Sequence, residues 1–393
     1  MTCVVIGGGV IGLSIAYRLA QEKYRVLVLD ENKMGSGPSR EVSRAASWAG
    51  AGILPAATLR NVDDPYERLR GLSHQLHAKW ASDLRQQTGI DTGFRQCGGW
   101  YVARTKAERA TLIAQRDLWE EQGIEVQWGS RHDLLRSEPA LESIARREID
   151  IEGWFVPEDC QIRNPRHLQA LQAACLNLGV ELLSQHHVDR LLWDQERLSG
   201  VVVGERMIQG DHYFFTAGAW TQQMLQWFGL PSGILPVRGQ MLLYQTEPGW
   251  LKSIINEGHR YLVPREDGYL LAGSCEEEVG YVCETTEEQV EILKEWVCSI
   301  LGSAWDREPL RAWAGLRPGV FDGLPYIGQL SRYPQVWVAA GHFRSGLHLS
   351  CATAECLVSL FRGESSPCDL TPFRPDRYWQ PSSPSISSIS RQH

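Results

Sequence analysis

The sequence predicts an α/β protein in which a Rossmann-like dinucleotide-binding domain is interwoven with an α+β domain built on an antiparallel sheet. Three observations predict this class. Residues 3–32 have a complete strand–helix–strand pattern. Further strand and helix patterns return around 160–218 and at 336–361, far along the chain from the first unit. The segments between them mix helices with alternating, antiparallel-type strands.

The first unit begins with a short buried strand over residues 3–6. Residues 10–22 then have apolar side chains at a helical spacing, including Val10, Leu13 and Ala16. Residues 25–29 form a second buried strand with Asp30 at its end. About thirty residues therefore suffice for one βαβ unit.

The rest of the chain alternates between helices and short strands. Asn164 is expected to cap one helix, with Pro165 at its first position, and Thr286 to cap another. Helices are predicted at 66–88, 106–122, 163–178, 285–301 and 344–361, and strands at 94–104, 201–203, 212–216, 237–245, 261–263, 269–273 and 336–340.

Composition excludes several classes of protein. The chain has 393 residues, a net charge of -8 and no basic tract, so we expect no nucleic-acid partner. The ten cysteines show no C-x-x-C pair and are expected to be reduced. The N-terminus has no signal-peptide pattern, and the apolar run 10–20 is too short for a bilayer, so we expect a cytoplasmic protein without a membrane partner. His186 and His187 lack further ligands at workable spacing, so no metal is expected.

The glycine motif at residues 7–12 fits G-x-G-x-x-G between the first strand and the first helix. Gly7 permits the tight turn, Gly9 lets the backbone approach a pyrophosphate, and Gly12 lets the helix pack close to the strand. The pyrophosphate is expected at the helix N-terminus, where N–H groups and the helix dipole favour negative charge. Asp30 is expected to bind a ribose, and the adjacent Glu31 is the alternative.

The motif alone does not distinguish NAD from FAD, but the C-terminal half favours FAD. Residues 336–347 read as a strand, a glycine turn and a new helix start that includes Arg344. Such a helix start can face the flavin pyrimidine, where reduction places negative charge.

In these and other segments the chain resembles the D-amino acid oxidase superfamily of FAD enzymes, and within it the glycine oxidases linked to thiamine biosynthesis. The resemblance covers roughly residues 3–363. It is carried by the segments 5–14, 46–54, 236–240, 261–265, 313–318 and 340–346.

The separated βαβ pieces predict two domains built from discontinuous segments, with a cleft between them. We expect an FAD-binding domain from 1–60, 150–220 and 310–365, and a substrate domain from 61–149 and 221–309. A disordered tail is expected at 380–393, where the sequence is rich in Ser and Pro. The link over 36–46 is several residues longer than is usual in the family, which makes the loop near the pyrophosphate harder to place.

The resemblance also assigns site residues. Arg317 would bind the substrate carboxylate, Tyr261 would lie across the same pocket, and Arg344 would lie near both flavin and substrate. The cofactor would contact Gly7, Gly9, Val10, Ile11, Gly12, Asp30, Ala46, Ser47, Gly52, Val188, Gly218, Gly315, His342, Arg344, Ser345, Gly346 and Leu347. No cysteine stands near Gly315, where sarcosine oxidases attach their flavin, so non-covalent FAD is expected.

The family reaction is hydride transfer from the substrate α-carbon to the flavin, followed by imine hydrolysis and reoxidation by oxygen to hydrogen peroxide. The expected substrates are glycine, sarcosine or small D-amino acids, and the products are the 2-oxo acid and ammonia. No side chain has to act as a strong base, although His259 and His342 are candidate proton acceptors.

Three alternatives stay open at this point. A D-amino acid dehydrogenase would pass electrons to an acceptor other than oxygen. A flavin-dependent tRNA modification module would use the same fold on a base, against which the net acidity argues. A non-catalytic FAD-binding protein would not need the carboxylate-binding arginine. The sequence leaves open the preferred amine and the oligomeric state, although related enzymes often form tetramers.

Overall fold

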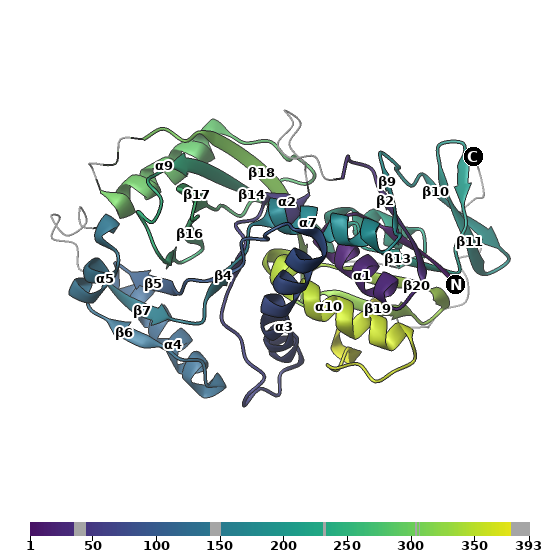
Figure 1. Cartoon of the computed structure of the whole chain (residues 1–393), viewed down its shortest axis with the longest axis horizontal. Coiled ribbons are helices and arrows are strands. Elements are labelled where there is room, and N and C mark those ends of the chain that lie inside the picture. Colours follow the sequence, from purple (N-terminus) through teal and green to yellow (C-terminus); the bar gives the residue numbers. More distant parts are fainter. Residues whose placement is uncertain (35–44, 142–150, 231–232, 303–304, 306, 379–393) are drawn as a thin grey trace.

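The computed structural model describes residues 1–34, 45–141, 151–230, 233–302, 305 and 307–378. Two large sheets organise the chain (Figure 1). The first has six strands in the order β19-β20-β13-β1-β2-β9, and all its neighbours are parallel except the β19–β20 pair. These strands are β1 (Thr2–Ile6), β2 (Arg25–Asp30), β9 (Glu181–Ser184), β13 (His212–Phe215), β19 (Tyr326–Leu330) and β20 (Tyr333–Ala340).

The strands of this sheet are apolar on both faces, as expected for a parallel sheet covered on both sides. In β1, Cys3 and Val5 face one apolar cluster while Val4 and Ile6 face another. The first cluster packs against helices and the second against a small three-stranded sheet. The continuous apolar run at residues 3–6 therefore reflects double-sided burial.

Four helices lie on the side of the first face of the six-stranded sheet, three of them packed against its strands and the fourth, α3, against other helices (Figure 1). They are α1 (Val10–Gln21), α3 (Pro65–Thr88), α7 (Asn164–Asn177) and α10 (Gly346–Phe361). Helix α10 packs against both α1 and α3, and α7 also contacts α1 and α3. The opposite face carries β10 (Arg190–Asp194), β11 (Arg197–Val203), β12 (Arg206–Ile208) and α8 (Thr221–Gln226).

The second large sheet has eight strands in the order β18-β14-β17-β16-β15-β5-β7-β6. It is antiparallel apart from the β15–β5 pair. Its strands are β5 (Gly99–Ala103), β6 (Gln127–Gly129), β7 (Glu152–Val156), β14 (Ile234–Gln245), β15 (Ile254–Glu257), β16 (Arg260–Pro264), β17 (Tyr269–Gly273) and β18 (Arg311–Val320).

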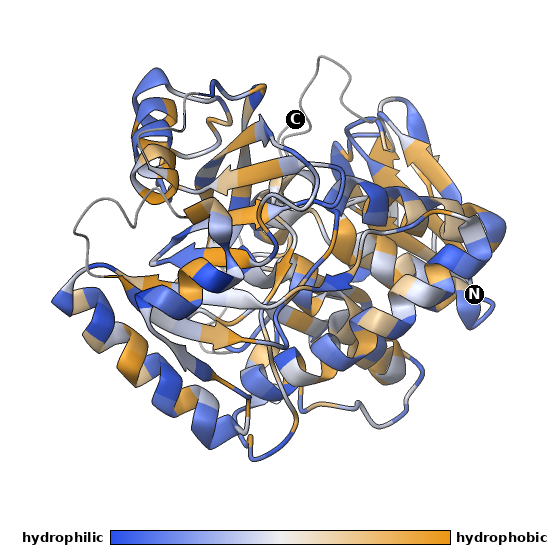
Figure 2. Cartoon of the chain, turned by 60° about the vertical axis from the view of Figure 1, so that its left-hand side comes forward, coloured by the Kyte–Doolittle hydropathy of each residue, from blue (hydrophilic) through white to orange (hydrophobic). Residues whose placement is uncertain are grey.

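Helices α4 (Lys106–Gln122), α5 (Arg131–Ser137) and α9 (Glu287–Leu301) pack on this second sheet. The outer faces of helices are largely hydrophilic, while many strand residues are hydrophobic (Figure 2). A further small sheet joins β3 (Ile53–Leu54), β8 (Cys160–Gln161) and β4 (Arg95–Gln96).

The mixed α/β class and the Rossmann-like parallel sheet agree with the expectation from sequence. The division into two domains stays a prediction. Two strands from segments assigned to one domain pair with strands of the other. β7 and β18 belong to segments assigned to the FAD-binding domain, yet both are hydrogen-bonded into the eight-stranded sheet. The expected tail at 380–393 and most of the 36–46 loop lie outside the described residues.

One expectation about a helix cap is wrong. Helix α7 begins at Asn164 itself, so Arg163 is the N-cap residue and Pro165 stands at the second helical position. The Asn164 side chain does not cap the helix, because its amide donates to the carbonyl oxygen of Ser47 at 2.9 Å. Among the described residues, we find no helix long and apolar enough to cross a membrane.

Candidate active site

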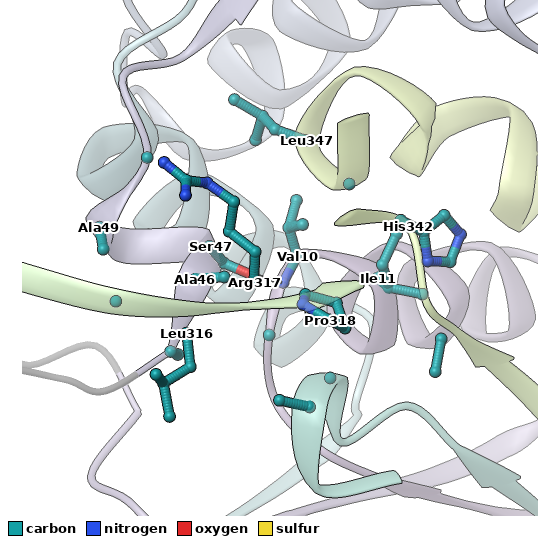
Figure 3. A pocket seen from close by; sticks show the side chains of 18 of the residues that line it. Val10, Ile11, Ala46, Ser47, Ala49, Leu316, Arg317, Pro318, His342 and Leu347 are labelled. Carbon is teal, nitrogen blue, oxygen red and sulfur yellow. Dashed lines mark hydrogen bonds between the residues drawn. The ribbon is translucent and has the colours of Figure 1, made fainter. Parts of the chain in front are cut away.

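A cavity of about 530 Å³ lies where residues of the two large sheets meet. The turns after β1, β2, β13 and β20 contribute to its lining, and so do residues of β14, β16 and β18. Figure 3 shows Val10 and Ile11 of α1, Ala46 and Ser47, and the strand that carries Leu316, Arg317 and Pro318 around the same space. The carboxyl end of a parallel sheet is the usual place for a ligand in such folds.

The glycine turn after β1 is closely packed. Gly7 has a φ of +111°, and a Cβ there would lie 2.6 Å from the carbonyl oxygen of Thr216. A Cβ at Gly12 would lie 1.9 Å from the carbonyl oxygen of Gly7. Only glycine permits this approach of α1 to β1, and Gly12 acts there by packing because it does not line the cavity.

The N-terminus of α1 has no side-chain cap at Gly9 and no acidic residue in its first turn. The Ser47 hydroxyl accepts a hydrogen bond from the Val10 N–H at 3.0 Å. A helix end that faces a cavity, with only the Val10 N–H bonded to a hydroxyl and no acidic residue in its first turn, is suited to an anionic group.

Asp30 lines the cavity at the end of β2. Its carboxylate accepts hydrogen bonds from Gly8 N–H at 2.6 Å and Asn32 N–H at 2.7 Å. Burial raises the pKa of Asp30, against the opposing effect of these two backbone hydrogen bonds. The adjacent Glu31 also lines the cavity and lies 3.1 Å from Nδ1 of His187.

The short helix α2 (Ala46–Ala49) packs closely on β18. A Cβ at Gly315 would lie 2.4 Å from the Cβ of Ala49, so a glycine is required at this crossing. The Trp313 indole N–H donates to the carbonyl oxygen of Ala49 at 3.0 Å. Gly52 has a φ of +75° and approaches the carbonyl oxygen of Ile162.

Arg317 extends from β18 past Ser47 in the view of Figure 3, and its guanidinium lies toward Ala49. It donates to Ser274 Oγ at 2.6 Å and to the Cys275 carbonyl oxygen at 3.0 Å. Gly239 leaves room for it, because a Cβ there would lie 2.2 Å from the guanidinium. The two bonds fix the group, and its other donors remain for a ligand in the cavity.

Tyr261 and Arg344 line the same cavity, but their contacts differ. The Tyr261 hydroxyl is 3.5 Å from the Met241 sulfur, a weak contact that leaves the hydroxyl suited to a better acceptor. Arg344 forms an ion pair with Glu276 and donates to the His259 carbonyl oxygen at 3.1 Å. Its charge is therefore partly balanced by the protein.

The two histidines considered as proton acceptors are held in their neutral forms. Burial lowers the pKa of His342 to about 3, and its Nε2 lies 3.1 Å from Thr353 Oγ1. In Figure 3 His342 lies on the opposite side of the cavity from the Arg317 guanidinium. Burial, and then the charge of Arg260, lower the pKa of His259, which does not line the cavity.

All the remaining residues expected at the cofactor also line the cavity: Val188, Gly218, Ser345, Gly346 and Leu347. Sequence reasoning missed several lining residues, namely Tyr101, Asn164, Met241, Asn256 and His348. Asn164 precedes a proline and is predicted from sequence only as a helix cap. The other four residues belong to no local sequence motif.

The site fits FAD. The α1 N-terminus can take a pyrophosphate, Asp30 can accept from a ribose, and α10 begins at the cavity with Gly346 and no side-chain cap. No cysteine is among the described residues that line the cavity. Within the described ranges, no group of three or more His, Cys, Asp or Glu side chains is placed to hold a metal ion.

Comparisons with known proteins agree with this geometry. Residues 2–360 match the family described as FAD dependent oxidoreductase. The chain is 31% identical over 383 residues to a glycine oxidase of Pseudomonas aeruginosa, with 95% of this chain and 98% of that protein covered. It is 30% identical to the "Bifunctional protein ThiO/ThiG" of Trichormus variabilis, with 95% of this chain and 55% of that protein covered.

A solved structure is also similar. The crystal structure of glycine oxidase from Geobacillus kaustophilus superposes with a TM-score of 0.86 at 28% identity, covering 95% of this chain and 98% of that one. The fold, the site and these likenesses lead to one conclusion: the chain belongs to the FAD dependent oxidoreductase family and is an FAD-dependent, glycine oxidase-like enzyme of amino acid oxidation.

Proposed function

We propose that the protein oxidises glycine or another small amino acid, such as sarcosine or a small D-amino acid, to the 2-oxo acid, ammonia and hydrogen peroxide. We further propose that it serves thiamine biosynthesis, because one of its relatives carries a thiamine-pathway name, ThiO/ThiG. The observation that carries the proposal is the Arg317 guanidinium, fixed by Ser274 and Cys275 at the cavity.

A carboxylate is the group that such an arginine binds best. A guanidinium presents paired N–H donors that match the two oxygens of a carboxylate, and the bond is charge-assisted. The Tyr261 hydroxyl, on a neighbouring part of the cavity wall, can add one more hydrogen bond. The two side chains would hold a small amino acid by its carboxylate and leave its α-carbon free to face the cofactor.

FAD, when bound, supplies the two-electron oxidant. The protein's contribution is to orient the α-C–H bond and to accept an amino acid whose nitrogen has lost its proton. The buried His342 is neutral and already bonded to Thr353, so it supports the cavity wall without being needed as a base. Non-covalent binding of FAD is expected because no described cavity residue is a cysteine.

The experiment compares Arg317→Ala with the unmodified protein on glycine and on an amine of similar size without a carboxylate. We expect kcat/KM for glycine to fall by a factor of about 100 to 5,000, which corresponds to the roughly 3–5 kcal/mol lost when one partner of a desolvated charge pair is removed. Arg317→Lys should recover only part of the rate, because an ammonium lacks the planar fork.

The control is the visible flavin spectrum, which should be nearly the same in both variants. The carboxylate-free amine should be a poor substrate of the unmodified protein and should lose much less on mutation. Equal losses for glycine and for the amine would refute the carboxylate role of Arg317 and would make Arg344 the next candidate.

A further inference from the structure

Four histidines from three helices gather directly behind the cavity. His74 and His77 come from α3, His167 from α7 and His348 from α10. The ring centroids of His74 and His348 are 5.6 Å apart, and those of His77 and His348 are 6.0 Å apart. His348 lines the cavity, whereas His74 is partly exposed on α3, so the pair spans from the cavity wall toward solvent.

His77 has an evident structural role. Its Nε2 lies 2.8 Å from the His348 carbonyl oxygen, which also accepts a hydrogen bond from the Ser73 hydroxyl. Because a carbonyl oxygen only accepts, the His77 proton is on Nε2 and Nδ1 is left to face Cys351 Sγ at 3.7 Å. His77 and Ser73 together fix the first turn of α10, and with it the position of the His348 ring.

Three of the four histidines have buried ring nitrogens without a hydrogen-bond partner among the described residues. In His167 both nitrogens are unpaired, but His167 does not line the cavity; in His74 the unpaired atom is Nδ1 and in His348 it is Nε2. Buried polar atoms in native proteins are nearly always bonded to protein or to ordered water. The two rings meet edge to face, and an ordered water molecule at their rim would give both nitrogens a partner.

Burial, with a nearby positive charge added to it, disfavours protonation of both rings. Burial lowers the pKa of His348, and the charge of Arg70 on α3 adds to this effect. The same two causes, burial first, lower the pKa of His74. Arg70 is itself paired with Glu67 at 2.7 Å. A neutral imidazole has one donor and one acceptor nitrogen, which is what a proton relay requires.

We propose that His348 and His74, bridged by water, form a proton relay between the FAD cavity and the solvent side of α3. The inference rests on the proposed function. The ammonium group of the substrate must release one proton before its Cα–H leaves as hydride, with both electrons, to FAD. One proton returns when oxygen takes those electrons and leaves as hydrogen peroxide. One proton per turnover therefore leaves the cavity and one re-enters it.

The test uses the FAD-loaded protein and the variants His74→Leu and His74→Gln, with His132→Leu on the exposed face of α5 as the matched control. Proton exchange at the His348 ring is measured by NMR on protein labelled with ¹⁵N-histidine. We expect His74→Leu to slow this exchange at least tenfold, to slow anaerobic flavin reduction by glycine by a similar factor, and to leave FAD affinity within twofold.

His74→Gln separates a relay from simple hydration. Glutamine can bind the bridging water, but its amide cannot switch between donor and acceptor as imidazole does. We therefore expect a crystal structure of His74→Gln to show the ordered water, while proton exchange at the His348 ring stays slow. Exchange restored by glutamine, or unchanged in His74→Leu, would overturn the relay. If no amino acid reduces the flavin, the proposed function fails, while the exchange measurement still decides on the relay.

Discussion

Asp30 illustrates what a single residue contributes to the cofactor site. The sequence predicted its position from the fingerprint, because the acid must end the second strand of the βαβ unit. The structure adds that its carboxylate also bonds to the Gly8 and Asn32 N–H groups, so it fixes the glycine turn as well as facing the cavity. Such a second task depends on the folded turn and has no separate sequence signal.

We predict that Asp30→Ala weakens FAD binding by about 10- to 100-fold without unfolding the chain. Hydrogen bonds to a charged group contribute about 1.5–3 kcal/mol, and part of that is lost with the ribose contact. The measurement is the flavin affinity of the apoprotein. Glu31→Ala is the matched control and should bind FAD as the unmodified protein does. The reverse pattern would assign the ribose to Glu31.

Other residue roles could not be read from local sequence. Arg317 was assigned only through resemblance, and its partners Ser274 and Cys275 are more than forty positions away in the chain. His74 and His348 are further apart still, so no spacing rule brings them together. Sequence reasoning finds residues that share one motif, whereas these contacts are created by packing of remote elements.

At the scale of elements, the glycines of the fingerprint allow α1 to pack closely against β1. The helix and strand boundaries of this unit were predicted closely, because strand burial and helical spacing are local signals. The start of α7 was wrong by one residue, since Asn164 bonds to Ser47 rather than to its own helix. The membership of β7 and β18 in the eight-stranded sheet was also not predictable, because pairing of distant strands leaves no local pattern.

We predict that Gly12→Ala destabilises the protein by about 2–3 kcal/mol and abolishes tight FAD binding. An alanine in a helix normally gains close to 1 kcal/mol over glycine, but a Cβ 1.9 Å from the Gly7 carbonyl oxygen requires α1 to move from β1. Urea unfolding and flavin titration measure both effects.

Gly8→Ala is the control for this prediction. Its Cβ would meet the flexible Met34 side chain at 2.5 Å rather than backbone, so Met34 can move and the loss should be smaller. Equal destabilisation by the two substitutions would mean that the α1–β1 approach is not the reason for glycine at position 12.

At the scale of the whole molecule, buried histidines set the response to acid. Burial lowers the pKa of His77 to about 4 and those of His167 and His342 to about 3, from an ordinary 6.5. Between the folded-state and the unfolded-state pKa of each histidine, the unfolded chain binds more protons than the folded one. The contribution of these histidines to the free energy of unfolding is therefore fully present above pH 6.5 and is lost as the pH falls. Asp159 opposes this, because burial raises its pKa to about 6.

We predict that the apoprotein loses stability between pH 6.5 and pH 5, because the buried histidines, His348 among them, outweigh the carboxyl groups whose pKa burial raises, namely Asp30, Glu138 and Asp159. Each histidine contributes up to about 2 kcal/mol over this interval. Urea midpoints at the two pH values measure the change, and substitution of the exposed His132 by Leu should leave it unaltered. A midpoint that is equal or higher at pH 5 would contradict the neutral, buried state of these rings.

The central claim, that the cavity holds non-covalent FAD and oxidises a small amino acid, is tested most directly on the purified protein. Its flavin should be bleached by glycine, sarcosine or a small D-amino acid in the absence of oxygen. Admission of oxygen should then restore the spectrum and release one hydrogen peroxide per flavin, and acid precipitation should leave the FAD in solution. Reduction without peroxide would indicate a dehydrogenase, and a flavin that no amino acid in the panel reduces would contradict the account.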